Sequence, residues 1–174
     1  EKLIIDFSTK GGKVAAVYLK EYESYSDFAK KSPKEKKAKN VVISKPLQLF
    51  RNGDALNELE IPINGKILRT GNELFELNKN EYNIDYTVNI EGFEGKTDPQ
   101  KVRLNLNTAF RRTERLFTEQ RRVSTVCYQY DKEGFDYLSE AGSDDEEATD
   151  DVSCIAFNQS YFSTIIKPHD RFAK

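Results

Sequence analysis

One segment of the chain alternates strictly between apolar and polar residues. In Tyr82–Ile90 (YNIDYTVNI) every second residue is apolar or aromatic, and polar residues occupy the positions between. Successive side chains of a β-strand point to opposite faces, so the pattern predicts a strand of about 30 Å with one dry and one wet face. Antiparallel sheets commonly have such faces. The side chains expected to point together into the core are those of Tyr82, Ile84, Tyr86, Val88 and Ile90.

Shorter segments of the same kind run along the rest of the chain, separated by turn residues such as Asn52-Gly53 and Asn64-Gly65. Many short strands at this spacing are typical of an antiparallel sandwich or barrel, and no long segment keeps helical apolar spacing. The sequence therefore predicts an all-β fold, with a single domain over residues 1–174. The other strands expected are Leu3–Phe7, Lys13–Lys20, Leu47–Phe50, Glu58–Ile63, Glu73–Leu77, Val102–Leu106, Val123–Tyr130, Val152–Asn158 and Tyr161–Ile166.

Two charged segments interrupt this pattern. Residues 26–45 form a lysine-rich insertion, which predicts a solvated loop that can contain a short helical turn. Residues 143–151 (SDDEEATDD) predict an acidic loop or exposed hairpin tip. Because both lack apolar residues that could offset the entropy of ordering them, we expect Asp144–Asp151 and Ser32–Lys39 to be mobile and dispensable for folding.

Composition narrows the function classes. The net charge of −2 gives no overall attraction for nucleic acid or an anionic membrane. No stretch approaches the ~18 apolar residues of a transmembrane helix. Because the chain contains no Met, we expect it to be a processed or excised piece of a longer protein.

Catalytic and phosphate-binding motifs are weak. Gly11-Gly12 is not followed by the GK[ST] motif of a phosphate loop, so it predicts a tight hairpin turn. His169 is the single histidine, and a Ser-His-Asp set would depend on it alone. We therefore expect no catalytic residue, no metal site, no cofactor and no enzymatic activity.

Two clusters of basic residues are candidates for a binding site. Interleaved aromatics around the arginines could form an anion or nucleic-acid site, but Glu114 and Glu119 lie inside the cluster, which favours a long loop or short helix with internal ion pairs. The six lysines between Lys30 and Lys39 could contact lipid headgroups, although a solvated loop is the default interpretation. The arginine cluster comprises Arg111, Arg112, Arg115, Arg121 and Arg122, with Phe110, Leu116 and Phe117 among them.

The two cysteines lie in two expected strands that an acidic segment connects. If those strands pair as a long hairpin, Cys127 and Cys154 could lie opposite one another. A disulfide is then plausible in an oxidising compartment, and two separate thiols are the alternative.

Two blocks of sequence resemble the extracytoplasmic domain of YidC-type membrane protein insertases, especially those of Bacteroidetes type. The first, Leu3–Tyr25 followed by PLQLF at Pro46–Phe50, is similar to the family's FSxxGG, VxxVxLKxYxxY and PLxLF phrases. The second, Leu104–Phe162, runs from LNLNTAFRRTERLF through TVCYQYDKEGFDYLSEAGSDDEE to IAFNQSYF, in the family's order. Family members usually pass almost directly from the first phrases to PLxLF, whereas residues 26–45 intervene here.

The resemblance implies the rest of the expectation. The family's domain is a β-supersandwich of two large antiparallel sheets, related in shape to galactose mutarotase-like folds. The resemblance also implies that the domain lies on the periplasmic side of the inner membrane. It implies a role in inserting inner-membrane proteins, alone or with the Sec translocon and accessory subunits of the SecDF kind. The parent's transmembrane segments, absent from this sequence, would carry the insertion groove.

Two rival functions remain open. The first is a carbohydrate-binding or sugar-modifying β-sandwich, which an aromatic-lined cleft with convergent carboxylates would favour. The second is a surface lipoprotein module without a membrane bundle.

Overall fold

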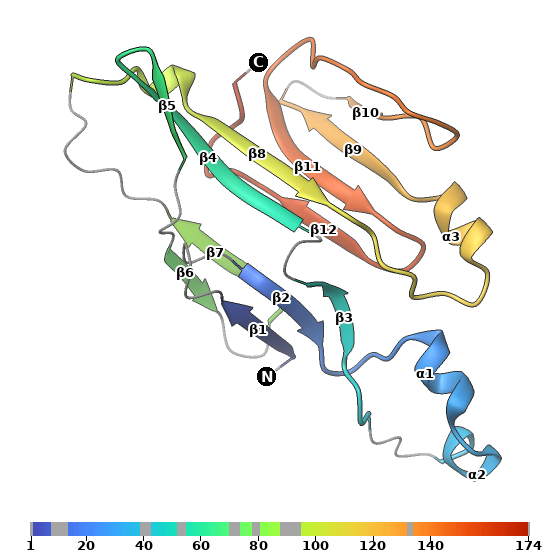
Figure 1. Ribbon diagram of the computed structural model, residues 1–174. Helices are drawn as coiled ribbons and strands as arrows, with labels where there is room; N and C mark the ends of the chain where they lie inside the picture. Colours follow the sequence, from blue (N-terminus) through green and yellow to red (C-terminus); the bar gives the residue numbers. More distant parts are fainter. Residues whose placement is uncertain are drawn as a thin grey trace. The chain divides into compact units, whose positions relative to one another are not determined.

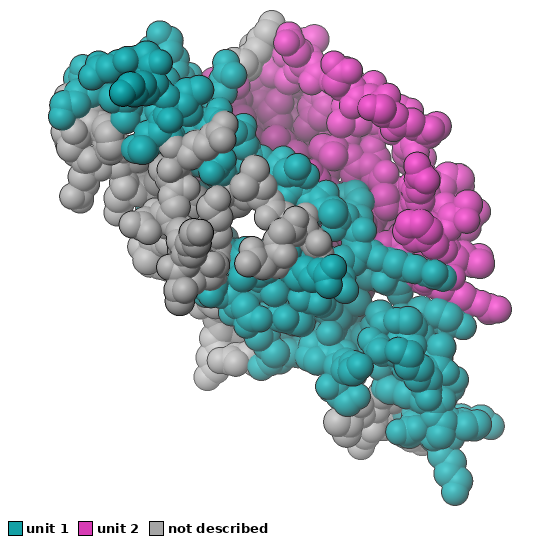
Figure 2. Space-filling view, viewed as in Figure 1, with its two compact units in different colours: residues 1–113 teal, residues 114–174 magenta. Residues whose placement is uncertain are grey.

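The computed structural model describes residues 2–7, 14–38, 43–51, 55–69, 74–77, 81–87, 95–131 and 134–173. They divide into two compact units, unit 1 (residues 1–113) and unit 2 (residues 114–174), shown in Figure 2. Within the described residues, no helix is both long enough and apolar enough to cross a membrane.

The described residues of unit 1 form three antiparallel sheets with the strand orders β1-β2-β3, β5-β4-β8 and β6-β7 (Figure 1). Its strands are β1 (Leu3–Phe7), β2 (Val14–Leu19), β3 (Leu47–Phe50), β4 (Ala55–Ile63), β5 (Lys66–Arg69), β6 (Leu74–Leu77), β7 (Ile84–Thr87) and β8 (Arg103–Thr108). Its helices are α1 (Tyr25–Lys30), α2 (Pro33–Lys36) and the short 3-10 turn η1 (Pro99–Lys101).

The core of unit 1 lies mainly on its two central strands. Ala16, Val17 and Leu19 of β2 are buried, as is Leu47 of the neighbouring β3. Residue Ile61 of β4 is only 1% exposed. Leu47 lies on the edge strand β3, so the core extends beyond the central strands β2 and β4.

The hairpin between β4 and β5 shows how local sequence sets the turn. Asn64 has φ of 48° and Gly65 has φ of 76°, the positive values that a two-residue hairpin turn requires. Pro62 cannot donate a backbone hydrogen bond, and it lies where β4 pairs with β5 rather than in the stretch that pairs with β8. The Thr97 hydroxyl donates to the Pro62 carbonyl at 2.7 Å.

Unit 2 is a single four-stranded antiparallel sheet of order β10-β9-β11-β12, preceded by the helix α3. Val152, at the start of β11, is buried and pairs with Phe172 through a pair of backbone hydrogen bonds of 3.0 and 2.8 Å. This bridge attaches the last described residues of the chain to the start of β11. The elements are α3 (Phe117–Arg122), β9 (Thr125–Tyr130), β10 (Phe135–Tyr137), β11 (Val152–Asn158) and β12 (Ser163–Ile166).

The all-β class predicted from the sequence is confirmed, and β1, β3 and β11 have the predicted bounds. Asn64-Gly65 forms the expected turn. The two-sheet supersandwich and the single domain over residues 1–174 stay predictions. The sequence missed β5 and β10, which are too short to show an alternating pattern.

The predicted strand Tyr82–Ile90 begins later in the structure, at Ile84. Ile84 and Tyr86 are half-buried and alternate with exposed residues, as expected. The inward placement of Tyr82 is wrong: it precedes β7, is 42% exposed, and its hydroxyl donates to Glu21 at 3.0 Å. The remaining predicted core positions, Val88 and Ile90, lie outside the described residues.

The two charged segments differ in their secondary structure. The lysine-rich segment contains α1 and α2, whereas residues 143–147 are exposed and have no regular structure. Asp151, at the end of the acidic segment, accepts a backbone hydrogen bond from Asp131 at 2.9 Å. That these segments are dispensable for folding stays a prediction.

Replacing Ile61 with Ala should lower the free energy of unfolding of unit 1 by about 3 kcal/mol, because it removes a buried side chain and leaves a cavity. Ile67→Ala is the matched control on the next strand, since Ile67 is 61% exposed, and it should cost about 0.5 kcal/mol or less. Urea denaturation followed by far-UV circular dichroism measures both. Equal losses in the two variants would contradict the assignment of Ile61 to the core.

Candidate interaction surface

One face of the unit 2 sheet carries no charged side chain among its described strand residues. The strand register places Tyr137, Cys127, Ala156 and Ile165 opposite one another across all four strands. Because alternate residues of each strand share a face, the rest of this face follows from the register. We call it the uncharged face, made up of Phe135, Tyr137, Thr125, Cys127, Gln129, Cys154, Ala156, Asn158, Ser163 and Ile165.

The apolar members of the uncharged face are exposed on its two edge strands. Phe135 is 70% exposed and Tyr137 is 53% exposed, both on β10, and Ile165 on β12 is 64% exposed. The rings of Phe135 and Tyr137 stack with centroids 6.4 Å apart and an interplanar angle of 27°. Together they form an accessible aromatic platform at one edge of the sheet.

The polar members of the face bond to one another across the strands. The amide of Asn158 donates to the Cys127 sulfur at 3.1 Å and accepts from the Ser163 hydroxyl at 2.6 Å. The Cys154 thiol donates to the side-chain oxygen of Gln129 at 3.7 Å. These hydrogen bonds pair the polar groups of the face with neutral partners. They involve no charged side chain, although 32% of the residues in the chain are charged.

The opposite face of the sheet is aromatic and faces the acidic segment. Tyr128 and Tyr130 lie edge to face, with ring centroids 5.4 Å apart. Burial raises the pKa of Tyr128, and the nearby Tyr130 and Glu146 add to the shift. Hydrogen bonds from Thr149 lower the pKa of Tyr130. The acidic segment thus contributes groups to this face.

The cysteines do not lie opposite one another, so that expectation is wrong. Cys154 pairs with Gln129, and Cys127 pairs with Ala156, which leaves the two thiols on a diagonal of the same face. Diagonal neighbours in antiparallel strands are about 7–8 Å apart, beyond the Cβ separation of a disulfide. Both cysteines are free.

The arginine cluster does not form one basic patch within either unit. Arg111 belongs to unit 1, where its guanidinium donates to Gln48 at 2.8 Å. In unit 2, Arg122 pairs with Glu119 at 3.1 Å within α3. Residues 117–122 therefore form a short helix with an internal ion pair. The sequence predicted this from the acidic residues inside the arginine cluster.

Gln120 is a buried polar residue that the sequence did not single out. It is 2% exposed, and its side chain accepts from the Glu114 backbone at 3.2 Å and donates to Gln159 at 3.0 Å. These bonds fasten α3 to the segment between β11 and β12. A glutamine within an arginine-rich stretch gave no signal of burial, because its partner lies 39 residues away.

The other sequence candidates do not gather into a site. His169 is exposed in the loop after β12. Across the described part of the chain, no group of three or more His, Cys, Asp or Glu side chains could hold a metal ion. Gly11-Gly12 lies outside the described residues. An open depression lies beside the β4–β5 turn, and none of the described residues that line it, such as Asn64, Lys96 and Asp98, is aromatic.

In comparisons with known proteins, the chain matches proteins named membrane protein insertase YidC. It is 29% identical to the membrane protein insertase YidC of Cytophaga hutchinsonii over 93% of this chain and 28% of that protein. It is 23% identical to YidC of Phocaeicola vulgatus, over 98% of this chain and 29% of that protein. This chain resembles part of a YidC insertase. These matches confirm the resemblance to YidC-type insertases that the sequence predicted.

The extent of the YidC match is limited. A YidC of Bacteroides fragilis is 22% identical over 58% of this chain. The chain spans less than a third of the length of the curated YidC relatives it matches. No protein-family model and no solved structure matches it.

Because of the diagonal register, both cysteines should be alkylated by iodoacetamide in the denatured chain without reductant, as intact mass should show. The Cys127→Ser and Cys154→Ser variants should each lose one adduct. An oxidised chain that takes up no label until it is reduced would contradict the register of β9 and β11.

Proposed function

We propose that this chain is a non-catalytic extracytoplasmic domain of a YidC-type insertase, on the periplasmic side of the inner membrane. In this role it contacts proteins and does not itself insert them. The observation that carries the proposal is the match of nearly the whole chain to one segment of curated YidC proteins. The proposed partners are nascent membrane proteins and the Sec translocon with its SecDF-like accessory subunits.

The uncharged face is the surface that suits such contacts best. Interface centres are enriched in aromatic residues and depleted in charged ones, and Phe135, Tyr137 and Ile165 have that character. Burying one such side chain completely contributes roughly 1.5–3 kcal/mol. The polar groups between them are neutral and bonded to one another, so covering them needs no charge to be desolvated.

The sheet edges offer a second element of recognition. The edge strands are β10 and β12 in the described sheet, and an edge strand can pair with an extended segment of another protein. The exposed rings lie on β10 itself, so a segment added there would gain backbone hydrogen bonds and apolar contact together.

A carbohydrate-binding role is the second candidate, and one observation favours it. Stacked rings beside neutral amide groups, as at Phe135, Tyr137 and Gln129, can also hold a sugar ring. However, sugar sites are commonly concave, and this platform lies on the open face of a sheet.

The decisive experiment is photo-crosslinking in the full-length parent protein in membranes. A benzophenone amino acid at position 135 or 165 should capture nascent membrane proteins or Sec subunits, identified by mass spectrometry. The same probe at Ile67 is the control, since that position is equally exposed and apolar but lies in unit 1. Equal capture from all three positions, or none from 135 and 165, would contradict a docking role for the uncharged face.

Calorimetry separates the two candidates. The isolated chain should show no micromolar binding of neutral oligosaccharides, because the exposed rings of Phe135 and Tyr137 lie on the open face of the described sheet. Binding that is lost in the Phe135→Ala and Tyr137→Ala variants but kept in Ile67→Ala would instead establish the carbohydrate role.

A further inference from the structure

The lysine-rich segment between β2 and β3 forms a small helical projection. We call residues 24–38, which contain α1 and α2, the lysine tip (Figure 1). Two backbone hydrogen bonds fasten its base to unit 1: Tyr25 donates to the Thr113 carbonyl at 2.9 Å, and Leu47 donates to the Tyr22 carbonyl at 2.7 Å. The tip therefore has a defined attachment to the sheets.

Local capping explains why such short helices form. Ser24 caps α1 by accepting from the Asp27 backbone at 3.2 Å. Ser32 and Glu35 form a reciprocal capping box on α2, with Pro33 at its first turn. Helices of this length are marginal in isolation, so the caps and the fastened base together hold them.

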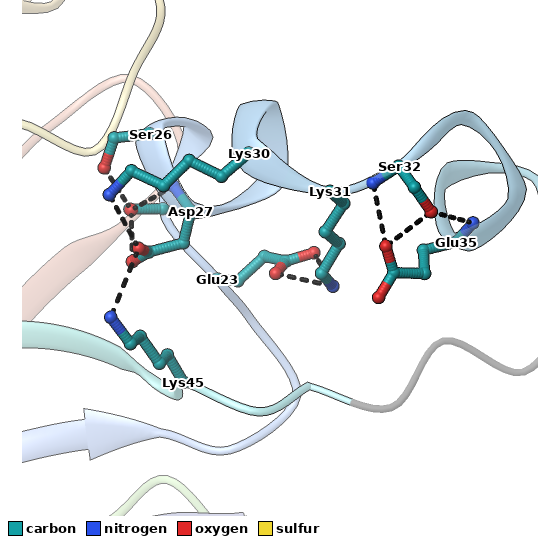
Figure 3. Close-up of polar contacts among 9 residues, drawn as sticks. Glu23, Ser26, Asp27, Lys30, Lys31, Ser32, Glu35 and Lys45 are labelled. Carbon is teal, nitrogen blue, oxygen red and sulfur yellow. Dashed lines mark hydrogen bonds and ion pairs between the residues drawn. The ribbon is translucent and has the colours of Figure 1, made fainter.

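The acidic groups of the tip and its base, Glu23, Asp27 and Glu35, are all engaged by nearby lysine or serine side chains (Figure 3). Glu23 pairs with Lys31 at 2.7 Å, and both side chains are only 13% exposed. Asp27 accepts from the Ser24 hydroxyl and lies near Lys30 and Lys45, at 3.6 and 3.9 Å. The Ser24 hydrogen bond, followed by these lysines, lowers the pKa of Asp27, and Ser32 lowers that of Glu35.

The remaining charge of the tip is positive and faces solvent. Residues 24–38 hold five lysines and two acidic residues, a net charge of +3 in a chain whose net charge is −2. The exposed side chains of Lys34, Lys36 and Lys37 have no acidic partner among the described residues. Lys36 donates to the Ala29 carbonyl at 2.9 Å, a bond that leaves its charge uncompensated.

Aromatic rings accompany these lysines. Tyr25 and Phe28 lie three residues apart on α1, with ring centroids separated by 6.5 Å, and they are 39% and 38% exposed. The Lys36 ammonium lies over the Phe28 ring, 5.5 Å from its centroid. Lysines beside partly exposed aromatic rings suit a boundary where an anionic layer meets an apolar one.

We propose that the lysine tip binds an anionic lipid surface. Lys34, Lys36 and Lys37 lie against the phosphate headgroups, and Phe28 and Tyr25 enter the boundary with the acyl chains. An acidic protein segment would satisfy the lysines but would offer the half-exposed rings no apolar layer. A nucleic acid could stack its bases on the rings, but the chain's net charge of −2 gives no overall attraction for it. The proposal is independent of the uncharged face and of the chain's role in an insertase.

Co-sedimentation with vesicles tests the proposal directly. The chain should bind vesicles of phosphatidylcholine with phosphatidylglycerol and should not bind vesicles of phosphatidylcholine alone. The double variant Lys34→Gln/Lys37→Gln should bind roughly 25-fold more weakly, since each lysine near an anionic surface contributes about a fivefold gain. Lys66→Gln/Lys167→Gln makes the same charge change at exposed lysines outside the tip and should bind as the native chain does.

The aromatic contribution separates lipid from other anions. Phe28→Ala keeps the charge, and it should weaken vesicle binding without changing the binding of polyglutamate. Far-UV circular dichroism confirms that each variant folds. The proposal is overturned if polyglutamate or DNA binds more tightly than the anionic vesicles, if the two lysine pairs lose binding equally, or if Phe28→Ala binds vesicles as the native chain does.

Discussion

The pairing of β9 with β11 decides what unit 2 presents on each face. The register shifts by one residue between Val152 and Cys154, so Val152 pairs with Tyr130 whereas Cys154 pairs with Gln129. Without that shift Val152 and Cys154 would share a face, because side chains alternate along a strand. The bulge lets Val152 be buried while the rest of β11 sends Cys154, Ala156 and Asn158 to the uncharged face.

Consequences of this register extend to the edges of the sheet. The row from Tyr137 through Cys127 and Ala156 to Ile165 exists because both neighbours of the central pair continue its alignment. A slip of one residue in β10 would replace Phe135 and Tyr137 on that face with Asp136. The absence of charge on the face is therefore a property of strand alignment as much as of composition.

The lysine tip is stabilised by different interactions from those of the sheet. Its helices are too short to be stable through their own hydrogen bonds, and no residue of α1 or α2 is buried. Capping by Ser24 and Ser32 and the pair of Glu23 with Lys31 hold the backbone instead. Because the acids are occupied in this way, the outer lysines remain available.

The sequence by itself determined the all-β class, the bounds of β1, β3 and β11, the turn at Asn64-Gly65 and the similarity to YidC proteins. These depend on alternation, turn chemistry and residue order, which are local. Tertiary structure alone decided the exposure of Tyr82, the burial of Gln120, the strand β10 and the diagonal placement of Cys127 and Cys154. Each of these depends on a partner distant in sequence or on a one-residue bulge, and an alternating pattern does not encode where its register shifts.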